Sequence, residues 1–326
     1  MELSGIHHVT AVSGDALANL DFYRRVLGLR LVKKTVNQDV INTYHLFYGD
    51  EAGHPGTEMT FFEWPNAGQH RPGAGDFSAT VFAVPDHAAL EWWAGRFDQQ
   101  RVAHGSIEDR GGRATLLFAD PEGQRLELVV GNREEVTPWR ESPVPQEVAI
   151  RGFAAVKLVV ARLEPTARLL TELLHFRQLS EYRSPSASSG RVVVFETGAG
   201  GTGTELHVQE DREGAQARVG IGGVHHVAFR TPTAEQHAAW QQELAEAGTG
   251  VTPVIDRFYF RAIYFREPGG ALFEIATDGP GFAGDEDVRH LGEHLSLPPF
   301  LESRRATIER GLRPIALEPL APALTH

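Results

Sequence analysis

The 326-residue sequence contains no cysteine. This absence excludes disulfide bonds, zinc–thiolate sites and thiol nucleophiles, so any bound metal must be held by histidine, aspartate or glutamate side chains. No apolar run approaches the roughly 20 residues that a membrane-spanning helix needs, and residues 1–4 lack the basic and then apolar pattern of a secretion signal. We therefore expect a cytoplasmic protein with no membrane partner.

Long blocks of one charge are also absent, although the formal net charge is −12. Nucleic acids and anionic membranes both require a cationic protein surface, so neither is an expected partner. The apolar fraction of 41% is enough for packed cores, and the length fits two domains. The expected partner is a small ligand that is uncharged or weakly acidic, and the composition leaves a homo-oligomer open.

The chain repeats itself with a constant offset of 147 residues. The correspondence runs from Gly5 and Gly152 to Glu127 and Glu274. Chance would not keep one offset over so long a stretch, so we infer two duplicated halves. Other matched pairs are Val9 and Val156, Leu27 and Leu174, Phe82 and Phe229, Trp93 and Trp240, and Pro121 and Pro268.

Each half divides again into two units with the pattern strand, helix, strand, strand. In the first unit, residues 5–12 alternate like a strand, and residues 15–27 carry apolar side chains at helical spacing before Gly28 ends the helix. Strand-like residues 44–48 and 59–62 follow. The second unit is expected as strand 77–84, helix 88–97, and strands 114–118 and 125–130.

The predicted fold is therefore α+β, with four βαββ modules in two tandem duplicated halves and a C-terminal helical tail. The Pro- and Glu-rich stretch after residue 136 is the natural linker between the halves. Within the tail, we expect one helix over residues 301–312. The expected domains are residues 1–136 (first pair of modules), 137–150 (linker), 151–278 (second pair of modules) and 279–326 (tail).

Adjacent histidines mark the first strands of the first and fourth units, as His7-His8 and His225-His226. Glu274 ends the fourth unit. Two neutral imidazoles and one carboxylate are the donor set of a non-haem metal site with three protein ligands on one face. Because alternate residues of a strand share a face, His8 and His226 can face one side while His7 and His225 point to the other.

The duplication indicates which units must pair. The counterparts of His8 and His226 at the 147-residue offset are alanines, so a sheet built from one half alone would hold one histidine and one glutamate. If the first and fourth units share a sheet instead, His8, His226 and Glu274 converge. We therefore predict one complete metal site and one vacated copy. The vacated copy consists of Ala155, Ala79 and Glu127.

No fourth carboxylate is expected at this metal site. The position of the first unit that corresponds to Glu274 lies on its last strand, at Thr60 or Phe61, and neither residue is a carboxylate. Three protein ligands leave coordination positions for substrate and dioxygen, as in Fe(II) oxygenases. The other histidines show no such symmetry and are interpreted as ordinary surface or core residues; they are His45, His54, His70, His87, His104, His175, His207, His237, His290, His294 and His326.

Taken together, these motifs resemble the vicinal oxygen chelate superfamily, most closely its ring-cleaving dioxygenases of the hydroquinone type. The resemblance covers nearly the whole chain. It implies that the modules form curved open barrels. It also implies Fe(II), or Mn(II) as in some relatives, held by His8, His226 and Glu274, with O2 as co-substrate and a small aromatic diol as substrate. It rests on Gly5-Ile6-His7-His8-Val9-Thr10, Tyr44-His45-Leu46-Phe47-Tyr48-Gly49-Asp50, Val224-His225-His226-Val227-Ala228-Phe229, Glu267-Pro268-Gly269-Gly270, Phe273-Glu274-Ile275-Ala276-Thr277-Asp278 and Leu297-Pro298-Pro299.

The resemblance further implies supporting or catalytic roles for His7, Thr10, His225, Arg257 and Tyr264. For His7 and His225 this requires a bulge or twist, because regular strand alternation turns them away from the metal. Arg257 could instead form a surface ion pair with Asp256, since the vacated copy keeps the equivalent Asp-Arg pair. Tyr264, in contrast, is replaced by leucine in that copy, which favours contact of its hydroxyl with the substrate.

Three alternatives remain open. A catechol-type extradiol dioxygenase shares the metal and the chemistry, and the sequence does not separate it from a hydroquinone enzyme. A glyoxalase-like lyase usually needs a fuller set of protein ligands, and the missing fourth carboxylate argues against it. A metal-free binding protein of the same superfamily would not need His8, His226 and Glu274.

Overall fold

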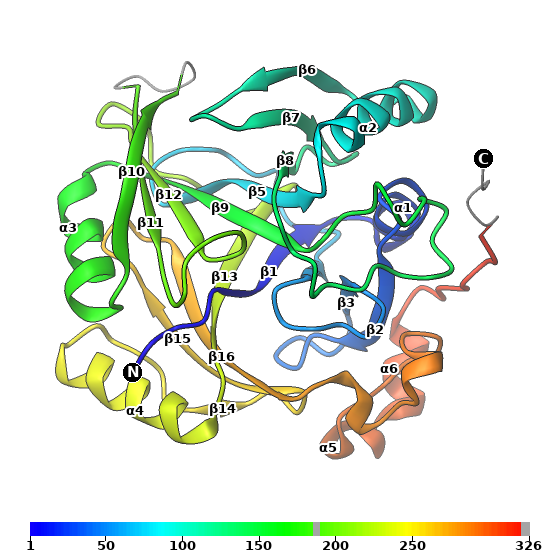
Figure 1. Ribbon diagram of the computed structural model, residues 1–326. Helices are drawn as coiled ribbons and strands as arrows, with labels where there is room; N and C mark the ends of the chain where they lie inside the picture. The colour runs from blue at the N-terminus through cyan, green and yellow to red at the C-terminus, as the bar shows by residue number, and fades with distance from the viewer. Residues whose placement is uncertain (185–189, 321–326) are drawn as a thin grey trace.

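The computed structural model describes residues 1–184 and 190–320 (Figure 1). Within these residues the strands form two curved eight-stranded sheets, ordered β14-β15-β16-β13-β1-β4-β3-β2 and β10-β11-β12-β9-β5-β8-β7-β6. The first sheet joins the first and fourth modules, and the second sheet joins the second and third. The predicted pairing is therefore confirmed. We call the first sheet the 1/4 barrel and the second the 2/3 barrel.

The four modules follow one element order. The first has β1 (Ile6–Ser13), α1 (Ala16–Asp21), β2 (Arg30–Val36), β3 (Tyr44–Gly49) and β4 (Glu58–Glu63). The second has β5 (Asp76–Val84), α2 (His87–Gln100), β6 (His104–Asp109), β7 (Ala114–Ala119) and β8 (Arg125–Val130). The third has β9 (Phe153–Val160), α3 (Leu163–Arg168), β10 (Arg177–Arg183), β11 (Arg191–Glu196) and β12 (Glu205–Glu210). The fourth has β13 (Gly223–Thr231), α4 (Ala234–Glu246), β14 (Ile255–Asp256), β15 (Phe260–Arg266) and β16 (Leu272–Pro280).

The α+β fold of duplicated modules is as predicted, but each module carries one more strand than the βαββ pattern. The additional strands are β2, β6, β10 and β14, which form the sheet edges. In β6 and β10 nearly every residue is exposed or half-buried, so neither strand shows the apolar alternation that identifies a strand in sequence. In β2 two consecutive lysines interrupt the apolar pattern, although the strand is buried.

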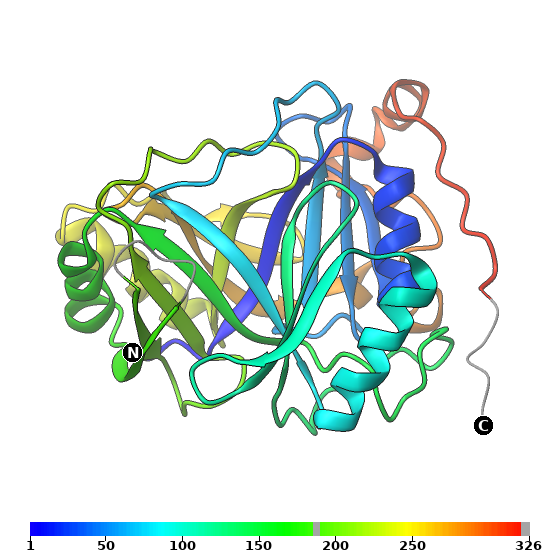
Figure 2. The same cartoon turned by 90° about the horizontal axis from the view of Figure 1, so that it is seen from above.

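The module helices lie on the outside of the curved sheets, and α1, α2 and α4 begin at side-chain caps (Figures 1 and 2). Asp15 accepts hydrogen bonds from the N–H groups of Leu17 and Ala18, which are among the first unpaired donors of α1. The predicted helix then continues as a π-helical turn over Phe22–Val26 and ends at Gly28, whose φ is +71°. Buried apolar side chains of these helices pack onto the sheets.

Residues 131–152, which are all described, form neither helix nor strand between β8 and β9. This segment is nevertheless held to the modules by specific hydrogen bonds. Trp93 Nε1 donates to the carbonyl oxygen of Val148 at 2.8 Å, and Ser142 Oγ donates to that of Gly28 at 2.9 Å.

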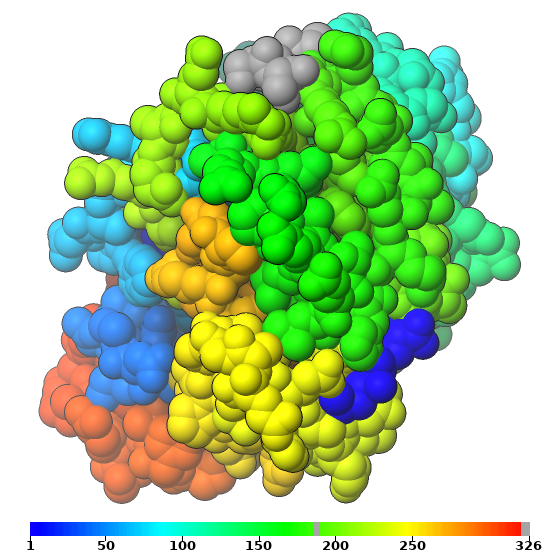
Figure 3. Space-filling view, turned by 90° about the vertical axis from the view of Figure 1, so that its left-hand side faces the viewer, coloured from blue at the N-terminus to red at the C-terminus, as the bar shows by residue number. Residues whose placement is uncertain are grey.

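In place of the one predicted helix, the tail has two short α-helices, α5 (Pro299–Glu302) and α6 (Arg305–Gly311), which follow two 3-10 helices, η3 (Phe282–Gly284) and η4 (Val288–His290). It packs against the first module, as the orange-red segment beside the blue one in Figure 3. Lys33 of β2 is fully buried and anchors the tail, because its ammonium donates to the carbonyl oxygen of Phe282 at 3.2 Å and to Asp285 at 2.7 Å. The tail thereby covers the β2 edge of the 1/4 barrel.

None of the described helices combines the length and the apolarity needed to cross a membrane.

Candidate metal centre

His8, His226 and Glu274 converge from three neighbouring strands of the 1/4 barrel. Strand β1 pairs with β13, and β13 pairs with β16. His8 Nε2 lies 3.3 Å from His226 Nε2 and 3.4 Å from Glu274 Oε2, and His226 Nε2 lies 2.9 Å from the same oxygen. All three side chains are at most 4% exposed. The structure therefore brings His8 and His226, which are 218 positions apart in the chain, to one point, as the sequence analysis predicted.

The donor set fits a divalent metal ion. Ligand atoms at about 2.1 Å from a first-row ion and at right angles to each other are about 3 Å apart, which matches the observed separations. Within the described residues, neither carboxylate oxygen of Glu274 accepts a well-directed hydrogen bond, although both are fully buried. Three lone-pair donors placed so closely repel one another unless a proton or a metal cation lies between them.

The electrostatics of the centre favour the forms that bind metal. Burial by itself raises the pKa of the Glu274 carboxyl, but the two imidazoles outweigh burial and hold that pKa well below its usual value. Burial also lowers the pKa of His226. An ionised carboxylate and a neutral imidazole are the forms that donate a lone pair to a metal ion.

His7 and His225 contact the two candidate histidine ligands at Nδ1, the ring nitrogen that faces away from the site. His7 Nδ1 lies 3.0 Å from His8 Nδ1, and His225 Nδ1 lies 2.7 Å from His226 Nδ1. If Nε2 of each ligand faces the metal, its Nδ1–H must donate to the supporting histidine, so both supporting rings accept at Nδ1. His7 can then donate from Nε2 to the carbonyl oxygen of Thr277, 3.0 Å away. Burial lowers the pKa of both His7 and His225 to about 3, which keeps them neutral acceptors.

Two β-bulges produce this arrangement. The β1–β13 register shifts once between Ile6 and His8 and once between Thr10 and Ala11. The first shift leaves His7 unpaired, and the second leaves His225 unpaired on the partner strand. An extra residue in one strand re-aims the neighbouring side chains, so adjacent histidines can approach the same centre. The sequence analysis required a bulge or a twist at these histidines, and a bulge is present at both positions.

Thr10 belongs to a buried hydrogen-bonded chain that includes an unpredicted histidine. Thr10 Oγ1 and Thr60 Oγ1 are 2.8 Å apart, and His45 Nε2 lies 3.0 Å from Thr60 Oγ1. Thr60 pairs with Thr10 in register and occupies the position on β4 that Glu274 occupies on β16. A hydroxyl thus stands where a fourth carboxylate ligand would stand.

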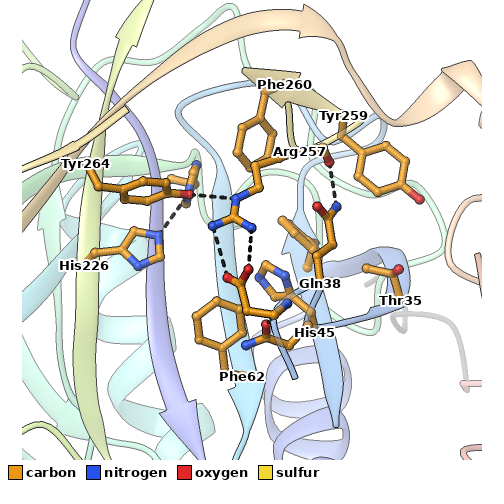
Figure 4. Close-up of a pocket in the computed structure, with 13 residues that line it drawn as sticks. Thr35, Gln38, His45, Phe62, His226, Arg257, Tyr259, Phe260 and Tyr264 are labelled. Carbon is orange, nitrogen blue, oxygen red and sulfur yellow. Dashed lines mark hydrogen bonds and ion pairs between the residues drawn. The ribbon is translucent and has the colours of Figure 1, made fainter. Parts of the chain in front are cut away.

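A cavity opens above the centre and is walled by aromatic side chains (Figure 4). Tyr264 and Arg257 lie side by side on this wall, with Arg257 Nε 3.3 Å from Tyr264 Oη, next to His226. Burial and the negative charge of Glu274 raise the pKa of Tyr264, so its hydroxyl is protonated. The cavity is lined by His8, Thr35, Asn37, Gln38, Asp39, His45, Phe47, Phe62, His226, Arg257, Tyr259, Phe260 and Tyr264.

The ion pair of Arg257 differs from the one considered in the sequence analysis. Its guanidinium contacts Asp39 at 3.1 Å, and Asp256 instead accepts a hydrogen bond from the backbone N–H of Phe258. Asp39 is 71% exposed, at the mouth of the cavity. Arg257 therefore joins the cavity wall to its entrance and is not a surface residue paired with its neighbour.

Two residues of the centre were missed by the sequence analysis. His45 was grouped with the ordinary histidines, yet it lines the cavity, and burial lowers its pKa well below the usual value. Its counterpart at the 147-residue offset is Val192, so the contrast that distinguished Tyr264 could also have identified His45. Glu58 lies with its Oε2 3.7 Å from His7 Nδ1, and burial raises its pKa well above the usual value. The counterpart of Glu58 at the 147-residue offset is also a glutamate, Glu205, so a comparison of the two halves could not have identified Glu58.

Comparison with known proteins identifies the family. The model of the Glyoxalase/Bleomycin resistance protein/Dioxygenase superfamily matches residues 5–128 and 152–275. MhqA of Bacillus subtilis strain 168, provisionally named a ring-cleaving dioxygenase, is 46% identical over 317 residues, which are 97% of this chain and 100% of MhqA. The chlorohydroquinone/hydroquinone 1,2-dioxygenase of Sphingobium indicum is 33% identical over 309 residues, covering 92% of this chain and 93% of that protein.

A solved structure agrees with these matches. A provisionally named dioxygenase from Bacillus subtilis is 40% identical and superimposes with a TM-score of 0.88, over 98% of this chain and 99% of that chain. Both duplicated halves, the pairing of the modules and nearly the full length are therefore shared. This chain belongs to the Glyoxalase/Bleomycin resistance protein/Dioxygenase superfamily.

Proposed function

We propose that this protein is an Fe(II)-dependent dioxygenase that opens the ring of a hydroquinone-like aromatic diol with O2. The observation that carries the proposal is the convergence of His8, His226 and Glu274, with Thr60 in place of a fourth ligand. Relatives named as ring-cleaving and hydroquinone dioxygenases over nearly the whole chain support the same reaction. In that reaction the bond between the hydroxylated carbon and its neighbour breaks, and both oxygen atoms enter the product.

His8, His226 and Glu274 would hold the metal ion. When bound, Fe(II), or Mn(II) as an alternative, supplies open coordination positions for the diol oxygen and O2 and passes electrons between them. His7 and His225 keep each ligand imidazole in the tautomer with Nε2 unprotonated. Loss of either supporting histidine would therefore weaken metal binding without removing a ligand.

Arg257 and Tyr264 would act on the substrate oxygens. The guanidinium is a fixed cationic donor beside the protonated Tyr264 hydroxyl, and both face the cavity. Together they can hold a phenolate oxygen and donate a hydrogen bond to oxygen on which negative charge develops. The aromatic side chains Phe62 and Phe260 form flat apolar walls that suit a ring and limit the access of water.

His45 would accept or return a proton at the cavity wall. Its ring is neutral, and its Nε2 is hydrogen-bonded to Thr60, which is hydrogen-bonded to Thr10, so this chain orients the ring for proton exchange with a diol in the cavity. A protein group that holds a proton within the cavity is needed because the diol must lose a proton to bind as an oxyanion.

Oxygen uptake after anaerobic loading with Fe(II) tests the proposal. The protein is mixed with a panel of hydroquinones, catechols and the methylglyoxal–thiol adduct, and products are identified by mass spectrometry. We expect one O2 consumed per hydroquinone opened, with both oxygen atoms in the product. Preferential turnover of catechols would instead assign a catechol-type enzyme. Isomerisation of the thiol adduct without oxygen uptake would assign a lyase.

A further inference from the structure

The 2/3 barrel encloses a cavity of about 390 Å³. It occupies the place that the candidate active site occupies in the 1/4 barrel, since Ala79, Arg110 and Leu117 are the counterparts of His226, Arg257 and Tyr264. A cavity of this size lies within the range of small-molecule pockets, about 300–1,000 Å³. It is lined by Ser78, Ala79, Arg110, Leu117, Phe118, Arg125, Leu126, Glu127, Lys157, Val159, Tyr182, Ser184, Val192, His207 and Gln209.

A lysine takes the place of a metal ion in this barrel. Lys157 Nζ donates to both carboxylate oxygens of Glu127, at 2.9 and 2.7 Å. Glu127 is the counterpart of Glu274, whose oxygens lack such a donor, and Lys157 is the counterpart of Thr10. The ammonium neutralises the carboxylate, and a divalent cation would be repelled by it. A lysine ammonium has three N–H groups, so one remains for a ligand in the cavity.

Cationic donors are in excess around the cavity. The Nε of Arg110 is buried and has no hydrogen-bond acceptor within the described residues. Its guanidinium also contacts Glu108 at 3.3 Å, but that carboxylate is 51% exposed and can be replaced by another anion. Arg125 adds a further positive charge at the rim. The other buried carboxylate nearby, Glu205, is already paired with Arg113.

Two further polar side chains of the lining are fixed in one orientation, and several other lining residues are apolar. His207 Nε2 lies 2.9 Å from Glu205 Oε2, so it donates there and its Nδ1 accepts from the Tyr182 hydroxyl at 3.1 Å. Leu117 and Val192 stand where the 1/4 barrel has Tyr264 and His45. A ligand in this cavity therefore meets both hydrogen-bond donors and hydrocarbon surfaces.

We propose that the 2/3 barrel is a binding site for a small organic carboxylate with a flat apolar body. The carboxylate contacts Arg110 and the ammonium of Lys157, and the body packs against Leu117 and Val192. A neutral ligand would leave the charge of Arg110 compensated only by the half-exposed Glu108, and a cation would be repelled by Arg110, Arg125 and Lys157. This site is distinct from the candidate metal centre and does not depend on the reaction proposed for it.

Fluorine NMR of 4-fluorobenzoate with the full iron-loaded chain tests the proposal. The measurement uses the Arg257→Gln variant, because Arg257 could bind the same anion in the 1/4 barrel. We expect saturable binding that weakens at least about tenfold when Arg110→Gln is added, since a charge-assisted hydrogen bond is lost. Leu117→Trp, which fills the cavity without changing a charge, should also remove binding. Circular dichroism verifies that each variant is folded.

The matched uncharged probe is 4-fluorobenzyl alcohol, which should bind at least about tenfold more weakly than the carboxylate, because it cannot pair with the arginine. Three results would overturn the proposal. They are the absence of saturable 4-fluorobenzoate binding, equal binding with and without Arg110→Gln, and binding of the alcohol as tight as that of the carboxylate.

Discussion

The two barrels share one backbone and differ in the side chains that face their cavities. The bulges of the β1–β13 pair are repeated in the β5–β9 pair, where Ser78 and Ala154 are the unpaired residues. These are the counterparts of His225 and His7. The backbone geometry that aims the histidines in the 1/4 barrel is thus present in the 2/3 barrel without any histidine to aim.

This difference shows how the charge of a buried glutamate is compensated. Glu274 is contacted by the imidazoles of His8 and His226 and has no lysine or arginine partner among the described side chains that contact it, whereas Glu127 is paired with Lys157. A buried carboxylate without a counter-charge is costly, so the first arrangement requires an added cation and the second does not. The fold provides the position for a metal. The side chains at four matched positions decide whether one is needed: His8, Thr10, His226 and Glu274 in the 1/4 barrel, and Ala155, Lys157, Ala79 and Glu127 in the 2/3 barrel.

Replacing a ligand with the residue of the other barrel should have the largest effect. His226→Ala installs the alanine found at position 79. Metal affinity should fall by more than the 10–100-fold typical of an outer-shell partner, and turnover should be lost with it. Metal content by mass spectrometry and oxygen uptake measure both. The matched control is His237→Gln, because His237 is also a buried histidine but donates to the carbonyl oxygen of Ile275. Full metal content in His226→Ala would refute the ligand assignment.

The next largest effect is expected at Tyr264. Tyr264→Phe should retain the metal and slow turnover by about 10²-fold, because one preorganised donor to the substrate oxygen is removed. Steady-state oxygen uptake per bound iron is the measurement. The control is Tyr48→Phe, which removes another buried hydroxyl. The Tyr48 hydroxyl donates to Asn19 Oδ1 at a distance of 2.9 Å and does not line the cavity, so its loss should leave turnover per iron unchanged. An unchanged rate in Tyr264→Phe would remove this hydroxyl from the reaction.

A smaller effect is expected at the supporting histidines. His225→Ser installs the residue of position 78 and removes the acceptor for His226 Nδ1. Metal affinity should fall by about 10–100-fold, while excess metal should restore most of kcat. Anaerobic Fe(II) titration measures the affinity. Substitution of the 63%-exposed His54 with serine serves as the control. A loss of kcat that excess metal does not restore would mean that His225 acts on the substrate and not on the ligand.

The smallest effect is expected at His45. His45→Val, which installs the valine of position 192, should keep the metal and lower kcat by about tenfold, near or below the low end of general acid–base contributions. His45→Gln keeps a hydrogen bond to Thr60 and should be intermediate in metal-saturated turnover if the hydrogen-bonded chain matters. Equal rates in the wild type and both variants would show that the chain through Thr60 has no part in the reaction.

Much of the fold and of the metal centre could be predicted from the sequence, because the duplication contains long-range information. The 147-residue offset shows that neither half has a complete donor set, which required the first and fourth modules to pair. The edge strands β6 and β10 could not be recognised, because they bury no apolar face.

Long-range contacts that the duplication does not indicate were also beyond the sequence. Asp39 pairs with Arg257 across 218 positions, and no pattern in either segment indicates it. His45 could have been identified from its valine counterpart, but the comparison was applied to Tyr264 alone. The sequence analysis could infer that the strand is irregular near His7 and His225, but it could not predict the exact bulge positions, because these depend on the pairing between β1 and β13.

The most direct test is a crystal structure of the Fe(II)-loaded protein with anomalous diffraction measured at the iron edge. We predict one anomalous peak per chain, between His8 Nε2, His226 Nε2 and Glu274 Oε2. A peak beside His7, His8 and Glu58, which also form a buried group of donor atoms, would contradict this account. So would a peak next to Glu127 in the 2/3 barrel.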